Sequence, residues 1–182
     1  MPTLATFIRI VDVLNERIGR TISWVALAMV LIQFLVVGMR YIFGVGSVFL
    51  QESVVYMHGT LFMAGAAYTL LHNGYVRVDI LYREASPRRK AWVDLFGVLF
   101  FLLPVSPLVW IVSEPYVAQS WSIREGSKET SGIQGIFLLK TMILVFATLL
   151  PLQGLALAAR SVLTLAEVKP PPPPDAAPQD SV

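Results

Sequence analysis

Four stretches of this sequence contain no aspartate, glutamate, lysine or arginine, and each is 19 residues long. They are Thr21–Met39, Ser53–Leu71, Leu95–Ser113 and Thr141–Ala159. About 20 apolar residues in an α-helix cross the hydrocarbon core of a bilayer, which is about 30 Å thick. The pattern therefore predicts an all-α integral membrane protein with four transmembrane helices. With their flanking residues, we expect the spans at 21–41, 53–73, 92–112 and 138–160.

Residues 1–20 precede the first span and have the pattern of an amphipathic helix. Apolar side chains recur on one face of such a helix, and the charged side chains lie elsewhere. The apolar positions are Phe7, Ile10, Val11, Leu14 and Ile18. This segment lies on the cytoplasmic surface of the membrane, extends the first span below the bilayer, or packs on protein. The sequence leaves these alternatives open.

Proline predicts a distortion in the third span and a different kind of structure at the end of the chain. Pro104 and Pro107 lack the N–H that an α-helix needs, so we expect a kink near the middle of this span. Five consecutive prolines, Pro170–Pro174, favour an extended polyproline conformation. We predict that residues 166–182 form a disordered tail outside the four-helix domain of residues 21–165.

The composition agrees with a membrane protein. Of the residues, 55% are hydrophobic and only 14% are charged, whereas soluble domains carry about 25% charged residues. The sequence has no cysteine, which excludes disulfides and thiolate metal sites. The net charge of +2 reflects an uneven distribution of lysine and arginine around the spans, and it does not imply nucleic-acid binding.

Lysine and arginine accumulate on one side of the predicted membrane. Ten lie in the N-terminal segment, in the loop between the second and third spans, and around the tail; the other side has four, offset by four glutamates. Positive charge favours the cytoplasmic side, so we expect both termini and the 72–91 loop in the cytoplasm. Arg40 and Tyr41 follow the first uncharged stretch, where a cleavage site would have small residues, so we expect the first span to be retained.

His58 and His72 are the only histidines, and we considered them as a haem-binding pair. They are 14 residues apart, and this spacing corresponds to about 21 Å along a helix, so they cannot bind the same iron. We expect His58 to donate an interhelical hydrogen bond and His72 to lie at the membrane interface. No catalytic residue, cofactor or metal site is predicted.

Arg40 and Glu52 lie at the outer boundary of the membrane, on either side of the short connection between the first two spans. The most direct interpretation is an ion pair that closes this helical hairpin. A proton or ion relay and a contact with another subunit are the alternatives. The four uncharged stretches place no aspartate, glutamate or lysine at the membrane midplane. The chain is therefore not expected to bind and couple ions unaided.

Further candidate residues lie in and after the second span. Gly59 and Gly65 belong to a run of small residues that lets a neighbouring helix approach closely. Arg77 and Asp79 suit a local ion pair at the cytoplasmic end of this span, although exposed pairs contribute only about 0–1 kcal/mol. The basic group that follows serves membrane topology or contacts anionic lipid headgroups. It consists of Arg83, Arg88, Arg89 and Lys90.

Three short motifs follow one another between residues 40 and 79. Arg40-Tyr41-Ile42-Phe43-Gly44 ends the first span. Phe49-Leu50-Gln51-Glu52 opens the second span, and Gly74-Tyr75-Val76-Arg77-Val78-Asp79 follows it. In order and spacing, the chain resembles the small, DctQ-type membrane subunit of tripartite ATP-independent periplasmic (TRAP) transporters over residues 11–165. It departs from that pattern at Phe49, Gln51 and Tyr75, where tryptophan, an acid and histidine are common.

The resemblance implies a subunit of a three-part importer. In this family a soluble periplasmic protein captures a carboxylate-bearing solute, and a large many-span permease moves it with sodium coupling. The small subunit would brace the large one in the bacterial inner membrane and help to dock the soluble protein. The residues expected at that docking surface lie in the outer loop. They are Trp121, Arg124, Glu125, Lys128 and Glu129.

Two other classes of function are alternatives. One is the membrane anchor of a respiratory haem or quinone enzyme, for which a haem absorption band would be the sign. The other is a small self-sufficient exporter, which would need a charge inside the spans that this sequence lacks.

Overall fold

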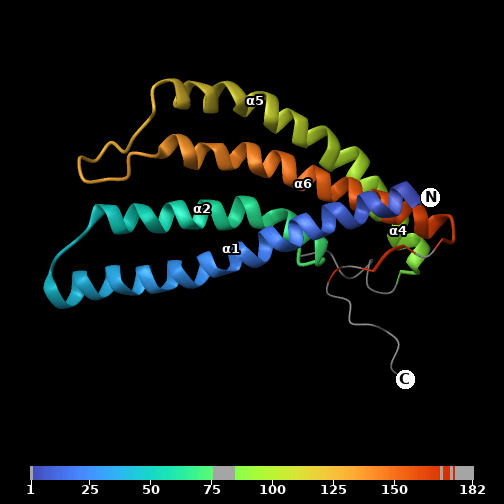
Figure 1. Ribbon diagram of the computed structural model, residues 1–182, viewed down its shortest axis with the longest axis horizontal. Coiled ribbons are helices and arrows are strands. Elements are labelled where there is room, and N and C mark those ends of the chain that lie inside the picture. The colour runs from blue at the N-terminus through green and yellow to red at the C-terminus, as the bar shows by residue number, and fades with distance from the viewer. Residues whose placement is uncertain (1, 76–84, 169, 173, 175–182) are drawn as a thin grey trace.

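The computed structural model describes residues 2–75, 85–168, 170–172 and 174, and every element assigned there is a helix (Figure 1). The helices are α1 (Pro2–Phe43), α2 (Val48–Leu71), α4 (Pro87–Gly97), the π-helical turn η1 (Val98–Leu102), α5 (Leu103–Ser122) and α6 (Ile136–Leu165). Because α4, η1 and α5 run on without a break, the described residues contain four helices that are long and apolar enough to cross a membrane. The prediction of an all-α fold with four membrane-spanning helices is confirmed.

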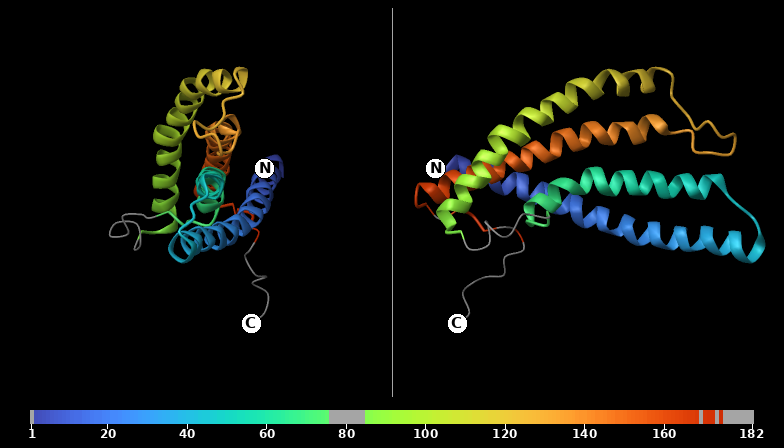
Figure 2. Two further views of the ribbon diagram at one scale, coloured as in Figure 1. Left: turned by 90° about the vertical axis from the view of Figure 1, so that its left-hand side faces the viewer. Right: turned by 180° about the vertical axis from the view of Figure 1, so that it is seen from behind.

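The four long helices lie side by side in the order α1, α2, α6, α5 (Figures 1 and 2). α2 packs against α1 and α6, and α6 also packs against α5, while α1 and α5 form the two edges. Many of the residues buried between the spans are alanines, such as Ala64, Ala67 and Ala147, which allow membrane helices to approach closely. No residue in the most apolar 18-residue window of α1 is buried. The layer therefore leaves its broad faces open.

The N-terminal segment is the first part of α1, which continues without interruption into the first span. Here α1 crosses the end of α6 (Figure 1), and Ile8 packs with Ala159 and Leu163. Three polar side chains of this segment are buried, whereas Arg9 and Arg17 are exposed and the apolar Ile10 is 63% exposed. The buried polar residues are Asp12, Asn15 and Glu16. Within the protein, the segment thus packs on α6 and continues into the first predicted span.

Three helices end with a residue in the left-handed conformation. These residues are Asn73, Arg124 and Glu167, with φ of 54°, 46° and 60°. In each case the next residue donates its backbone N–H to the carbonyl five residues earlier, over 2.8 to 3.0 Å. This Schellman geometry satisfies carbonyls at the helix end. Glycine usually occupies this position, but none of these three residues is a glycine. The sequence therefore does not mark these three helix ends.

The distortion expected near the prolines of the third span is the π-helical turn η1, just before Pro104. Pro104 has no N–H to donate to the preceding turn, and a widened turn is one way for a helix to accommodate it. The N–H of Leu103 bonds to the carbonyl of Val98 there. Leu102 packs closely on Gly154 of α6, where an added Cβ would lie 2.2 Å from Leu102 Cδ2. The π-turn therefore forms part of the contact between α6 and the third span.

Candidate functional site

The N-terminal end of α2 is joined through Glu52 to the loop between α5 and α6, which we call the outer loop after its predicted side of the membrane. Its carboxylate accepts a hydrogen bond from the backbone N–H of Ile133 at 2.6 Å and another from the hydroxyl of Ser127. The hydroxyl of Tyr56, one turn further along α2, donates to the carbonyl of Ile133 at 3.4 Å. The expected Arg40–Glu52 ion pair is wrong: it is absent from the ion pairs of the described residues, and Arg40 is exposed.

A second carboxylate fixes the other end of the same loop. Glu125 accepts hydrogen bonds from Lys140 Nζ at 2.5 Å and from Ser120 Oγ at 2.7 Å. The ammonium of Lys140 also lies 3.8 Å from the centre of the Tyr116 ring. The hydrogen bond from Lys140, with help from Ser120, holds the pKa of Glu125 below its ordinary value. Glu125 thus binds α5 and α6 to each other.

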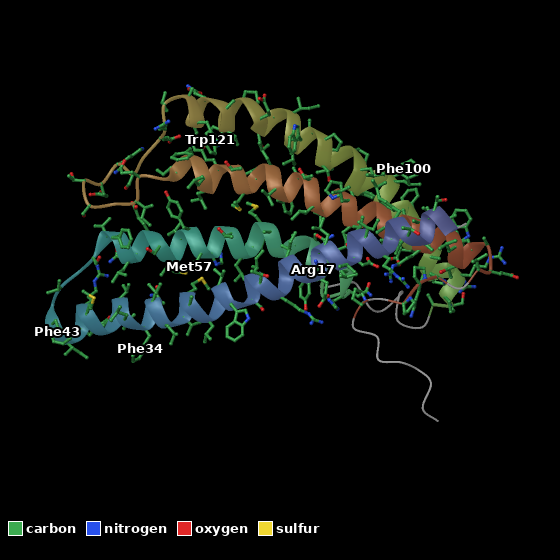
Figure 3. All side chains as sticks on the ribbon, in the orientation of Figure 1. Arg17, Phe34, Phe43, Met57, Phe100 and Trp121 are labelled. Atoms are coloured by element: carbon green, nitrogen blue, oxygen red, sulfur yellow. The ribbon has the colours of Figure 1, made fainter. Side chains whose placement is uncertain are left out.

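Trp121, at the outer end of α5 (Figure 3), contacts α6 as well. Its indole N–H donates to Thr141 Oγ1 at 2.9 Å. Its ring packs edge-on against that of Phe137, with 4.7 Å between the ring centres. The side chain is still 47% exposed. Of the five residues predicted for docking, Trp121 and Glu125 therefore stabilise the loop itself. Arg124, Lys128 and Glu129 are exposed beside them.

At the opposite end of the layer, α1 and α6 share a buried polar cluster. The carboxylate of Asp12 forms an ion pair with the guanidinium of Arg160 and accepts a hydrogen bond from Gln153 Nε2 at 3.1 Å. Asn15 Nδ2 donates to Gln153 Oε1 at 2.7 Å and to the carbonyl of Val11. Asp12, Asn15 and Gln153 are each no more than 2% exposed. The cluster thus joins the first and last helices.

A second part of this cluster, which lies at the end of the layer predicted to face the cytoplasm and is called the inner cluster below, joins α1 to the C-terminal end of α2. Glu16 accepts hydrogen bonds from Arg20 Nε at 2.6 Å and from His72 Nε2 at 2.7 Å. One turn away, the ring of Tyr68 lies so close to Gly19 that an added Cβ would be 2.1 Å from Tyr68 Cδ2. Figure 3 shows Arg17 on this part of α1, where the helices converge.

Sequence reasoning missed this inner cluster, although a signal was present. The polar positions of α1 recur three and four residues apart, which places them on one helical face. Gln153 and Arg160 are seven residues apart, which places them on one face of α6. Polar residues with this spacing on two membrane helices predict that the two faces meet.

His58 lies on an exposed part of α2 in the middle of its span. Its ring stacks on Phe62 with 6.4 Å between ring centres. No hydrogen bond joins His58 to another helix within the described residues, so the expected interhelical bond is not formed inside this chain. Gln33 of α1 lines a cavity together with His58 and is also exposed. No cluster of three or more metal-ligating side chains occurs in the described residues.

The chain was compared with known protein families, curated proteins and solved structures. Residues 29–168 match the sequence model of the family described as "Tripartite ATP-independent periplasmic transporters, DctQ component". The match covers well over half of the chain. The chain belongs to this family. No curated protein and no solved structure matched it.

As a small TRAP subunit the chain is a transporter component and not an enzyme, which leaves the respiratory anchor unsupported. Its family works with a large permease and a solute-binding protein. The candidate glycines of this subunit differ in environment. A Cβ at Gly59 would lie 2.7 Å from Leu139 of α6, and one at Gly74 would lie 3.1 Å from Thr69, whereas one at Gly65 would meet nothing within 4 Å.

The basic group of this TRAP subunit is described in part. Arg77, Asp79 and Arg83 lie outside the described residues. Ser86 caps the N-terminus of α4 through a hydrogen bond from the N–H of Arg89, at 3.4 Å. The other three members of the basic group lie in the first turn of α4. Arg88 and Arg89 are exposed there, and Lys90 is partly buried.

Proposed function

We propose that this subunit braces the large permease of a sodium-coupled TRAP importer for carboxylate-bearing organic solutes. The observation that carries the proposal is the open, one-layer arrangement of helices that contain no charge at mid-membrane. A helix layer with exposed faces suits packing against another membrane chain. The absence of a midplane charge suits a chain that does not itself move ions.

The orientation in the bacterial inner membrane follows from charge. Both termini and the inner polar cluster would lie on the cytoplasmic side, because positive residues gather there. The loop between α5 and α6 would then face the periplasm. Its fixed backbone and exposed charges at Arg124, Lys128 and Glu129 suit contact with the soluble binding protein. Such charges chiefly affect the rate of encounter and the choice of partner.

Transport by the purified system tests the bracing role. The large permease and this subunit are reconstituted together in proteoliposomes, and the binding protein loaded with its solute is added outside. Uptake is expected to require the small subunit and an inward sodium gradient. Uptake by the large permease alone at the full rate, or uptake without sodium, would contradict the corresponding part of the proposal.

The docking role has its own test. The substitutions Lys128→Glu and Arg124→Glu are expected to raise the concentration of binding protein needed for half-maximal uptake, with a larger effect at low salt. Arg88→Glu, with the same charge change at the opposite end of the molecule, serves as the control. An equal effect of Arg88→Glu would mean that the loop is not the docking surface.

Contact with anionic lipid headgroups is proposed for the basic group. Arg88 and Arg89 stand beside the exposed Trp92 at the inner end of the third span, an arrangement typical of the membrane interface. Each basic residue near an anionic surface contributes about 1 kcal/mol. Replacing both arginines by glutamine is expected to reduce the anionic phospholipid that remains bound after detergent extraction. Unchanged lipid retention would count against the contact.

A further inference from the structure

A groove runs along the junction of α1 and α2 on one broad face of the layer. Its inner part is an open cavity of about 740 Å³, lined by α1, α2, α6, Tyr75 and Leu102 of η1. An adjoining cavity of about 440 Å³ lies between α1 and α2. His58 lines both cavities, so they form one continuous depression. We call this depression the α1/α2 groove.

Two polar side chains line the groove at the depth of the bilayer centre. His58 is ten residues from the start of α2, and Gln33 is ten residues from the end of α1. Each is therefore about 15 Å from the outer end of its helix. Both are exposed, and neither forms a hydrogen bond with another described residue. An amide and an imidazole facing lipid tails would lack partners, which is costly in a membrane.

The groove also has room for a closely approaching helix. Gly65 lines it seven residues after His58, on the same face of α2, and an added Cβ would meet nothing within 4 Å. Phe62 lies between them and is 68% exposed. A small residue beside a large one on an open face is typical of a surface against which another membrane helix packs.

A third open cavity of the molecule lacks these features. It lies between α5 and α6, and its volume is about 420 Å³. Apart from the indole of Trp110, its one polar side chain is Thr148, whose hydroxyl bonds to the carbonyl of Leu144 at 2.7 Å. Lipid tails satisfy such a surface, but they cannot bond to Gln33 and His58. The polar pair therefore distinguishes the α1/α2 groove.

We propose that the α1/α2 groove receives one transmembrane helix of the large permease, with a hydrogen-bonding side chain opposite Gln33 and His58. This inference rests on the proposed bracing function and names the surface that performs it. The occupant is assigned to the large permease because this subunit's family works with that chain in the membrane, and the permease has many transmembrane helices. The polar pair sets the depth and rotation of the incoming helix, and the opening at Gly65 lets its backbone come near.

Site-specific photo-crosslinking tests the assignment. A photoreactive phenylalanine analogue replaces Phe62, which lines the groove, or Phe34, which is 78% exposed and points away from α2 (Figure 3). With both membrane subunits co-expressed, Phe62 is expected to crosslink to the large permease and Phe34 is not. A crosslink from Phe62 to a second copy of this chain, or to lipid alone, would overturn the proposal. So would a permease crosslink confined to Phe34.

A steric test uses two glycines at which an added Cβ meets nothing. Gly65 lies in the groove, while Gly38 is five residues from Gln33 and so about 140° away around α1. Gly65→Leu is expected to lower the affinity for the large permease about tenfold, which corresponds to about 1.4 kcal/mol. Gly38→Leu is expected to leave this affinity unchanged, and both variants should be at least as stable as the wild type in isolation, because each removes a glycine from a helix. Equal affinities of the two variants for the permease would refute the groove as the binding site of the permease helix.

The two proposals fail in different ways. If the wild-type chain does not co-purify with the large permease, the bracing function is wrong. If it co-purifies but neither Phe62 crosslinking nor Gly65→Leu distinguishes the groove, the bracing function stands and only the surface is wrong. The double substitution Gln33→Leu and His58→Phe provides a third test. It removes the proposed hydrogen bonds to the permease helix without filling the groove.

Discussion

Asp12, in the first turns of α1, forms an ion pair with Arg160 in the last turns of α6, and the side chain of Asp12 is only 2% exposed. The two residues of this pair are 148 positions apart in the sequence. Gln153 completes it by donating to the second carboxylate oxygen. A buried carboxylate needs such partners, because an unpaired charge is costly away from water. The contact holds α1 against α6 where the two helices cross.

Arg160→Met is expected to destabilise the isolated chain by about 3–5 kcal/mol, because it leaves a buried carboxylate without its cation. The free energy of unfolding is measured by denaturing titration in mixed micelles. Asp12→Asn combined with Arg160→Met should recover part of the loss, since a neutral amide replaces the unpaired charge. Arg17→Met, at an exposed arginine of the same helix, should change stability by less than about 0.5 kcal/mol.

Gly19 and Tyr68 define how closely α1 and α2 approach at the same end. Gly19→Ala would place a methyl group about 2 Å from the tyrosine ring, and overpacking of this kind costs about 1–3 kcal/mol. Gly38→Ala on the same helix meets nothing and should stabilise the helix by about 0.5–1 kcal/mol. Thermal unfolding of the two variants in detergent gives the comparison. A stable Gly19→Ala variant would mean that the helices separate without cost.

The spans were predictable because the bilayer imposes their length and apolarity. The last span was expected at 138–160 and lies within α6, Ile136–Leu165. The inner cluster was not predicted, because an amphipathic pattern does not say which face meets protein. In a membrane chain the polar face can be the buried one, as Asp12 and Asn15 illustrate. The presence of Pro104 in the third span predicted a distortion of the helix, but it did not predict that the distortion is a π-turn.

The partners of Glu52 could not be read from the sequence for a different reason. A carboxylate at a membrane boundary can pair with any donor in reach, and Arg40 was the nearest basic residue in the sequence. The backbone N–H of Ile133, which binds it, lies 81 residues away. Backbone donors leave no trace in residue identity, so only the folded loop reveals this contact. The same holds for Trp121, whose indole bonds to Thr141 instead of pointing freely outward.

Glu52→Gln is expected to loosen the outer loop, because the amide accepts weaker hydrogen bonds from Ile133 and Ser127 than the carboxylate does. Trypsin cleavage after Arg124 and Lys128, which lie in this loop, should become faster and is followed by mass spectrometry. Arg40→Glu alone should leave the cleavage rate unchanged, since Arg40 does not pair with Glu52. Rescue of Glu52→Arg by Arg40→Glu would restore the discarded ion-pair interpretation.

Protonation of Glu125 should release the other end of the loop. The hydrogen bond from Lys140 lowers the pKa of Glu125 below its ordinary value of 4.5. Since the folded state favours the carboxylate, its contribution to stability is fully present above pH 4.5 and is lost as the pH falls through the lower folded-state pKa. Trp121 lies beside this contact and reports on it by fluorescence once the other three tryptophans are replaced by phenylalanine.

The fluorescence of Trp121 is therefore expected to shift to longer wavelength below about pH 4.5, as water reaches the separated ring. Glu125→Gln should remove this transition, because the amide does not titrate. Glu129→Gln, in the same loop but exposed, should leave the transition in place. A transition that persists in Glu125→Gln would show that another group controls the loop, and the pairing of Glu125 with Lys140 would not be what holds α5 and α6 together at the outer surface.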